Sequence, residues 1–277
     1  MEGLVANGNA RPIMLIDRQL AAQLEAADAH NLRQYTAAVA QVVPASQATW
    51  AQIGDATACY TGPDLPINRA VGAGSQQPWQ ARQFGELEDF YRQRQLPASL
   101  ELTPFCDPSL QGVLAQRNYQ IIRWWSVLAF DMLRYTPFSP SSVQSRMIAP
   151  EQSELWVEGI TNHGQSSPMG ITMAKAAAAR SDSQLFGAWL DDHLIGCGAL
   201  SINAEVATLF STFVKPDWRR RGAQTSLIAA RLAYAHAQGC RWATVLTISG
   251  SDSQRIVTRA GFELAYNKVT LEEQRGS

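Results

Sequence analysis

The spacing of apolar residues predicts alternating helices and strands between residues 17 and 271. Residues 17–41 carry apolar side chains at helical spacing, which predicts one long amphipathic helix. After Pro44, short apolar runs around Gly54-Asp55 predict two strands joined by a tight turn. The further elements predicted in this half are strand 67–71, helix 80–95, strand 99–102, helix 108–116 and strand 119–130.

Residues 134–153, RYTPFSPSSVQSRMIAPEQS, interrupt both periodicities because they contain three prolines and a cluster of serines. Such a composition predicts a connector, so we expect domains at 1–135 and 154–277 with a linker at 136–153. The elements predicted beyond it are strand 155–159, helix 169–179, a hairpin turning at Asp191-Asp192, strand 207–214, helix 222–238, strand 243–247, helix 251–260 and strand 262–271.

The two halves show the same order of predicted elements. Helix 80–95 and the three elements after it match helix 222–238 and the three elements after it. This order favours an internal duplication whose sequences have diverged. The alternative is that strands and helices simply alternate, as they do in many α/β proteins.

Composition describes an ordinary globular chain and excludes few functions. Its 277 residues exceed the commonest domain size, about 100–150, so two domains fit. With 23 Lys plus Arg against 24 Asp plus Glu, the formal charge of −1 argues against nucleic acid or anionic lipid as a partner. The sequence has no apolar run long enough for a membrane span and no leader in its opening residues, MEGLVANGNARP, which predicts a cytoplasmic protein.

The cysteines and histidines show no metal-ligand spacing, so we expect no metal site. The four cysteines lie far apart and are predicted to be buried thiols.

The segment STFVKPDWRRRGAQTSLIAARLAYA has the composition of a phosphate-binding loop. It places a strand, a proline, an arginine-rich turn with one glycine and an amphipathic helix in direct succession. The first N–H groups of a helix have no partner within it, and the helix dipole favours an anion there. Glycine lets the backbone approach a pyrophosphate closely, and arginines can bind its oxygens.

This stretch resembles the acyl-CoA-binding motif R/Q-x-x-G-x-G/A of the GNAT superfamily of N-acetyltransferases. Arg219, Gly222 and Gln224 occupy its three defined positions, with Gln224 in place of a small residue. Farther on, SQRIVTRAGF resembles the Gly-Phe end of the family's next helix, so the resemblance covers most of residues 155–271. It implies an α/β (α+β) protein of two tandem GNAT-like domains, each a mixed, mostly antiparallel sheet flanked by helices, the N-terminal one degenerate.

The resemblance also implies which residues hold acyl-CoA. The backbone amides from Arg220 to Thr225 would bind the pyrophosphate, with the Arg219 and Arg221 side chains beside it. The backbone of the preceding strand would pair with the pantetheine arm. The cofactor-binding residues predicted in this way are Phe213, Val214, Arg219, Arg220, Arg221, Gly222, Ala223, Gln224, Thr225 and Ser253. Ser249 also lies ahead of the last helix, and capping is the alternative role for Ser253.

The catalytic acid and base are less apparent. Many relatives place an acidic tyrosine four residues before the Gly-Phe pair, but Val257 stands there. Tyr266 could replace it, although a strand tyrosine is often structural. Glu205 could act as a base through water, or lie exposed in a turn.

A second match to the motif, RAVGAG at residues 69–74, sits too early relative to its helix, so we expect it to bind no cofactor.

The resemblance thus predicts an acyltransferase that transfers an acyl group from acyl-CoA directly to a primary amine of a small molecule or peptide. Acetyl is the acyl group that we expect. A non-catalytic acyl-CoA-binding or interaction module is the alternative. A longer acyl donor is a further alternative, because apolar Leu209, Phe210, Phe213 and Trp218 could line a tunnel or fill the core. The acceptor and the oligomeric state stay open.

Overall fold

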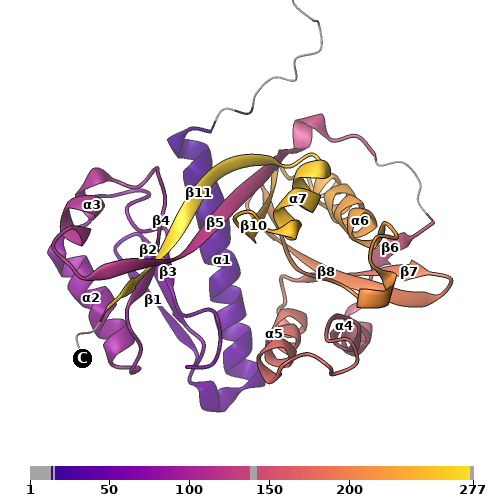
Figure 1. The fold of residues 1–277 in the computed structure, drawn as a ribbon, viewed down its shortest axis with the longest axis horizontal. Helices are drawn as coiled ribbons and strands as arrows, with labels where there is room; N and C mark the ends of the chain where they lie inside the picture. Colours follow the sequence, from indigo (N-terminus) through magenta and orange to yellow (C-terminus); the bar gives the residue numbers. More distant parts are fainter. Residues whose placement is uncertain (1–13, 15, 138–141, 275–277) are drawn as a thin grey trace, which may run out of the picture.

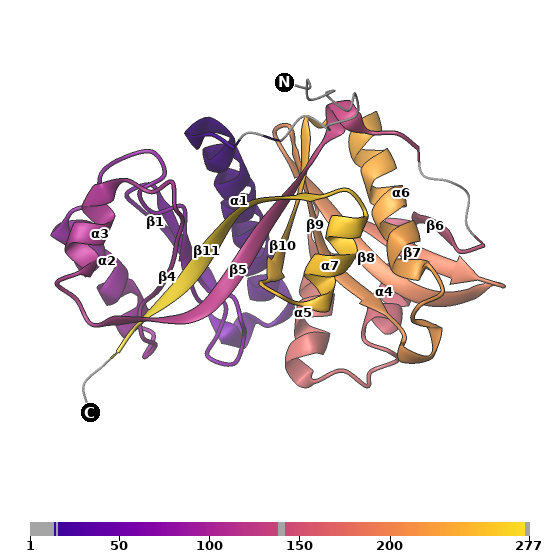
Figure 2. The ribbon, with the colours of Figure 1, turned by 45° about the horizontal axis from the view of Figure 1, so that its top comes forward.

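The computed structural model describes residues 14, 16–137 and 142–274, so residues 138–141 of the predicted linker and the opening residues 1–13 lie outside it. Its strands form one eleven-stranded sheet, in the order β1-β2-β3-β4-β11-β5-β10-β9-β8-β7-β6, with helices on both faces (Figures 1 and 2). The strands are β1 Thr49–Ile53, β2 Ala56–Tyr60, β3 Ala70–Val71, β4 Ser99–Leu102, β5 Tyr119–Asp131, β6 Gln144–Met147, β7 Gln184–Leu190, β8 His193–Asn203, β9 Val206–Val214, β10 Trp242–Ile248 and β11 Glu263–Glu273. The α-helices are α1 Arg18–Val42, α2 Ala81–Arg92, α3 Pro108–Leu114, α4 Ser153–Ile160, α5 Pro168–Ala179, α6 Ala223–Ala237 and α7 Asp252–Arg259.

Helix α1 confirms the long helix predicted from the apolar spacing. Asp17 caps it, because its carboxylate accepts the Leu20 N–H at 2.8 Å. Its apolar side packs on strands of both halves: Val39 joins a core cluster with residues of β2 and β8, and Leu24 joins one with residues of β5 and β9. The helix therefore lies across the middle of the molecule (Figure 1).

The mostly antiparallel sheet flanked by helices agrees with the predicted fold class. The β7–β8 hairpin turns at Asp191 and Asp192, whose φ values of 49° and 62° are those of a type I′ turn.

Two local predictions are wrong. Residues 155–159, predicted as a strand, belong to helix α4, because Trp156 and Gly159 lie on one helical face against β8. A Cβ on Gly159 would come within 2.7 Å of Cys197 Sγ, which shows how closely the helix approaches that strand. In the linker, Gln144–Met147 forms β6, an edge strand whose polar, largely exposed residues carry no apolar alternation.

The two halves exchange their last strands at the centre of the sheet. Strand β5, which ends the first half, pairs with β10 of the second half, and β11, which ends the second half, pairs with β4 of the first. The two exchanged strands pair with each other along almost their whole lengths (Figure 2). The predicted domain boundaries therefore cut through a continuous sheet.

The exchanged strands make the sheet order symmetric. Strands β1 to β4 lie on one side of the β11–β5 pair in the same succession as β7 to β10 on the other side. The parallel pairs among the described strands, β3 with β4 and β9 with β10, occupy equivalent places.

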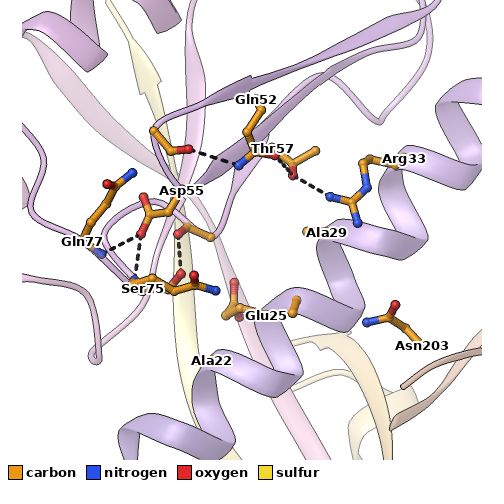
Figure 3. Close-up of a pocket in the computed structure, with 14 residues that line it drawn as sticks. Ala22, Glu25, Ala29, Arg33, Gln52, Asp55, Thr57, Ser75, Gln77 and Asn203 are labelled. Atoms are coloured by element: carbon orange, nitrogen blue, oxygen red, sulfur yellow. Dashed lines mark hydrogen bonds between the residues drawn. The ribbon is translucent and has the colours of Figure 1, made fainter. Parts of the chain in front are cut away.

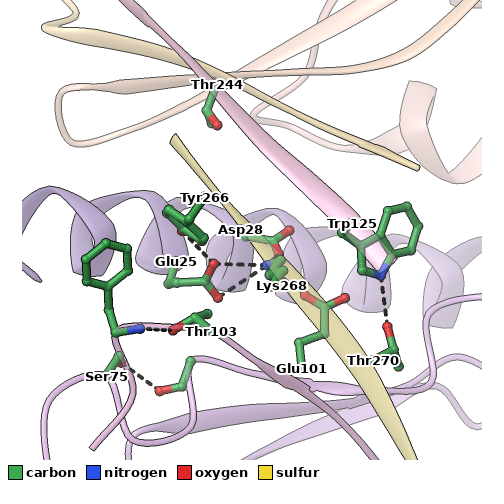
Figure 4. Close-up of polar contacts among 12 residues, drawn as sticks. Glu25, Asp28, Ser75, Glu101, Thr103, Trp125, Thr244, Tyr266, Lys268 and Thr270 are labelled. Carbon is green, nitrogen blue, oxygen red and sulfur yellow. Dashed lines mark hydrogen bonds and ion pairs between the residues drawn. The ribbon is translucent and has the colours of Figure 1, made fainter. Parts of the chain in front are cut away.

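A buried cluster of charges joins the halves where α1 crosses β11 and β4 (Figure 4). Lys268 Nζ of β11 lies 3.0 Å from Glu25 Oε1, 2.7 Å from Asp28 Oδ2 and 2.7 Å from Glu101 Oε2. Arg69 adds a second cation 2.5 Å from Glu101, and Tyr266 donates to Glu25 at 2.8 Å. We call these six residues the inter-half cluster. The three carboxylates lie close enough together to hold a metal ion, but the Lys268 ammonium takes the place between them.

Candidate functional site

The loop at the start of α6, residues 219–225, has the free backbone donors that the sequence predicts; we call it the α6 loop. Gly222 stands at the N-cap with φ = 87°, a left-handed conformation that favours glycine. No side chain caps the helix, and Ser226 is the first residue whose N–H bonds back, to Gly222 O at 2.9 Å. Among the described residues, the N–H groups from Arg220 to Thr225 have no acceptor. An anion could accept from them.

The charges around the α6 loop suit such an anion. The side chains of Arg219, Arg220 and Arg221 are exposed, and none forms an ion pair with a carboxylate among the residues described. Arg221 stacks over the Trp218 ring at 4.9 Å, which gives its guanidinium a defined place. A bound phosphate would therefore meet unpaired cations as well as the positive end of the helix dipole.

Strands β9 and β10 separate in front of the α6 loop. They pair only from Val206–Thr208 with Trp242–Thr244, although β9 continues to Val214 and β10 to Ile248. Beyond Thr208, the β9 edge facing β10 carries no strand ladder, so the backbone of Phe213 and Val214 is open on that side to pairing with an extended ligand.

The other predicted site residues lie apart from the α6 loop. Glu205 is exposed just before β9, and nine residues at about 3.3 Å each place it roughly 30 Å along the strand from Val214. Tyr266 is 5% exposed, and its hydroxyl donates to Glu25 in the inter-half cluster. Burial raises the pKa of Tyr266 well above its usual value. The catalytic roles of both residues stay predictions.

Around α7, Ser251 rather than Ser253 caps the helix, accepting the Gln254 N–H at 3.3 Å, while Ser253 is exposed. Ser249 Oγ lies 2.9 Å from Ser126 Oγ of β5. Val257 is 4% exposed in the apolar core, so its position offers no acidic group.

Arg231 of α6 is a polar residue close to this site that the sequence analysis missed. It is 1% exposed, and its Nη1 donates to Ala199 O at 3.2 Å and to Thr212 Oγ1 at 2.9 Å. Burial lowers the pKa of Arg231 to about 9, which still leaves the guanidinium charged at neutral pH. The sequence feature that could have indicated a buried Arg231 is its place four residues after Leu227, on the apolar face of a predicted helix.

In the loop that carries the second motif in the first half, a carboxylate of the chain accepts several of the backbone N–H groups. Asp55, in the β1–β2 turn, accepts the backbone N–H groups of Gly74, Gln76 and Gln77 at 3.0, 2.8 and 3.2 Å. Its Oδ1 also accepts the indole N–H of Trp79 at 2.5 Å. The Asp55 carboxylate therefore accepts the N–H groups that a bound anion would need.

We expect Asp55→Asn to lower the free energy of unfolding by about 1–3 kcal/mol, because the amide keeps one acceptor oxygen where the carboxylate had two. Denaturant unfolding measures the change. Asp64→Asn is the matched control, since Asp64 is exposed and has no partner among the described residues. Equal stability of both variants would contradict a structural role for Asp55.

A polar cavity of ≈ 430 Å³ lies beside this loop, between α1, the β1–β2 hairpin and Asn203 of the second half (Figure 3). Arg33, whose Nη1 donates to Thr57 Oγ1 at 3.4 Å, lines it together with Glu25. A second groove, of ≈ 480 Å³, runs from Gly222 and Thr225 along the alanine side chains of α6. Only the second groove contains predicted site residues.

Comparison with known proteins identifies the domain that contains the α6 loop. Residues 151–262 match the family model described as Acetyltransferase (GNAT) family. The search of curated proteins found no match. No helix among the described residues is long and apolar enough to cross a membrane.

Solved structures share the fold over most of the chain. A GCN5-related N-acetyltransferase from Kribbella flavida has a TM-score of 0.62 and 20% identity, covering 93% of this chain and 96% of its own. A tandem GNAT protein from the clavulanic acid biosynthesis pathway has a TM-score of 0.56 and 16% identity, with coverage of 80% and 79%. A GCN5-related N-acetyltransferase from Sphaerobacter thermophilus has a TM-score of 0.52 and 18% identity, with coverage of 71% and 68%. Residues 151–262 therefore match the GNAT acetyltransferase family model, and the chain shares the fold of these solved GNAT structures.

Proposed function

We propose that the chain transfers an acetyl group from acetyl-CoA directly to a primary amine of a small molecule or peptide. The observation that carries this proposal is the α6 loop, where backbone N–H groups without an acceptor lie beside three arginines without a carboxylate partner in the described part of the chain. When bound, acyl-CoA supplies an activated thioester. The α6 loop would hold its pyrophosphate, and the open backbone of Phe213 and Val214 would orient its arm and offer an N–H to the acyl oxygen.

Direct transfer is supported by the state of the cysteines. All four are buried free thiols, and burial raises the pKa of Cys59 to about 11 and that of Cys197 to about 12. A thiolate that could take the acyl group is therefore scarce at neutral pH. Free thiols also suit the reducing cytoplasm, which we propose as the location.

Acetyl, rather than a long chain, is supported by the packing of the apolar residues near the α6 loop. Leu209 is 3% exposed within the core, and Phe210 packs edge-on against Tyr35 at 5.5 Å. Leu209 therefore fills the core, and the half-buried Phe210 packs against core residues.

The first half, in this proposal, is a degenerate copy of the same domain that binds no CoA. The symmetric strand order supports the duplication, and the Asp55 carboxylate supports the loss of binding, because it occupies the donors of the equivalent loop.

The second candidate is a binder of acyl-CoA without catalysis. The observation in its favour is Val257, which is buried in the core at the position where many relatives supply the acid.

Titration calorimetry and an acyl-transfer assay separate the two functions. We expect one CoA to bind per chain, and acetyl-CoA to release CoA in the presence of at least one amine from a panel of small amines, aminoglycosides and peptides. A 100-fold excess of CoA over its dissociation constant should stabilise the fold by about 2.7 kcal/mol. Tight CoA binding without transfer to any amine would favour the second candidate, and two CoA molecules per chain would contradict the degenerate first half.

A further inference from the structure

The part of β9 that does not pair with β10 contains a β-bulge, and neighbouring side chains support its shape. Phe213 pairs with Cys197 and Phe210 with Ala199, so Ser211 and Thr212 lie opposite the single residue Gly198. Ser211 has φ = 46°, in the left-handed region that is unfavourable for a non-glycine residue. Such a conformation persists only where its surroundings impose it. The bulge directly precedes Phe213 and Val214, so its shape sets the direction of the open backbone.

One support of the bulge comes from the first half of the chain. Tyr35 of α1 is 5% exposed, and its hydroxyl lies 2.6 Å from Ser211 Oγ. The Arg180 guanidinium stacks over both the Tyr35 and Phe210 rings, at 4.7 and 4.6 Å. Burial raises the pKa of Tyr35, so the hydroxyl keeps its proton and can donate it to Ser211.

The other support comes from the opposite face of the sheet. Arg231 of α6 donates to Phe210 O at 3.4 Å and to Thr212 Oγ1 at 2.9 Å. Its guanidinium passes over Gly198, where a Cβ would lie 3.0 Å from it. Arg231 of α6 thus bonds to the residues on both sides of Ser211, whereas the Ser211 hydroxyl bonds to Tyr35.

We propose that Tyr35 is a positioning residue for acyl transfer: it reaches from the first half to Ser211 and fixes the β9 bulge beside the site of the second half. The proposal rests on the function proposed for the α6 loop and β9. It gives the first half a task that requires no ligand of its own. A displacement of about 1 Å in a group that orients the reacting atoms can lower the rate about 100-fold. Loss of one buried hydroxyl can therefore lower the rate of acyl transfer measurably.

Tyr35→Phe tests the proposal, with Tyr91→Phe as the matched control. Tyr91 is a fully buried tyrosine of the first half whose hydroxyl donates to Cys59 O of β2 at 3.0 Å and not to β9. Hydrogen exchange of the backbone from 209 to 214, without any ligand, should be faster in Tyr35→Phe and unchanged in Tyr91→Phe. With acetyl-CoA and an amine that supports turnover, kcat should fall at least about 10-fold in Tyr35→Phe while KM for acetyl-CoA changes less than about 3-fold.

A double-mutant cycle identifies the partner. Ser211→Ala should reproduce the effects of Tyr35→Phe, and the double variant should lose no more than either single variant, because both remove the same hydrogen bond. Wild-type exchange at 209–214 in Tyr35→Phe, or an equal change in Tyr91→Phe, would overturn the proposal. If the wild-type chain transferred acetyl to no amine, the function proposed above would fail, and the exchange measurement would still decide whether Tyr35 holds the bulge.

Discussion

Lys268→Met is expected to lower the free energy of unfolding by about 3–5 kcal/mol, the usual cost of removing one partner from a buried ion pair. Lys268 is 1% exposed, and its ammonium contacts three carboxylates from α1 and β4. Burial alone lowers the pKa of Lys268, but Asp28 and the two glutamates outweigh it and hold the pKa well above its usual value. Methionine fills a similar volume and leaves those carboxylates with Arg69 as their remaining cation.

Denaturant unfolding of Lys268→Met beside Lys175→Met measures this effect. Lys175 lies exposed on α5 without a partner among the described residues, so the same substitution there should change stability by less than about 0.5 kcal/mol. We also expect one cooperative transition in the wild type, because the inter-half cluster and the exchanged strands join both halves. Similar losses in the two variants would show that the ion pairs contribute little.

The contribution of Asp28 to the acid response should have opposite signs in the wild type and in Lys268→Met. In the wild type, burial raises the pKa of Asp28, but Lys268 and Arg69 outweigh it and hold the pKa below its usual value. A lowered folded-state pKa gives stability that is present above about pH 4 and lost as the pH falls through the folded value. Without Lys268, burial and mutual repulsion raise the carboxylate pKa values, as burial already does for Glu25. Stability of the variant should therefore rise as the pH falls from 7 towards 5.

Gly222→Asp is expected to weaken CoA binding by at least about 100-fold, which corresponds to about 2.7 kcal/mol. The substitution places a carboxylate at the N-cap of α6, beside the N–H groups proposed to bind the pyrophosphate. Aspartate is a good N-cap, so its oxygen would also accept those N–H groups, as Asp55 does in the first half. Titration calorimetry with CoA measures the affinity.

Gly222→Asn is the matched control, because asparagine has the size of aspartate and tolerates the left-handed φ of 87° but carries no charge. It should keep more of the affinity than Gly222→Asp, and the difference between the variants reports the repulsion between carboxylate and phosphate. Full CoA affinity in Gly222→Asp would mean that the pyrophosphate binds elsewhere.

Local pattern was sufficient for most helices and strands, because each buries one continuous apolar side. Helix α1 and the hairpins at Gly54-Asp55 and Asp191-Asp192 followed from spacing and turn residues. The pattern failed where burial came from distant residues. Helix α4 buries only Trp156 and Gly159, and β6 is an edge strand with little apolar surface.

The α6 loop was visible in the sequence because its chemistry is local. A strand end, a glycine and a helix N-terminus follow one another, and the first N–H groups of a helix have no acceptor within the helix itself. The arginines at 219–221 are likewise adjacent in the chain.

By itself, then, the sequence determined most of the elements and the loop proposed to bind a phosphate-rich ligand, because these depend on residues within one turn or one periodic face; the fold class followed from the family resemblance. Only the tertiary structure shows that β5 pairs with β10 and β11 with β4. It alone also shows that Lys268 lies among three carboxylates and that the Tyr35 hydroxyl contacts Ser211. Each of these contacts joins residues more than a hundred positions apart. No local periodicity encodes such pairings, which are set by the packing of α1 across both halves of the sheet.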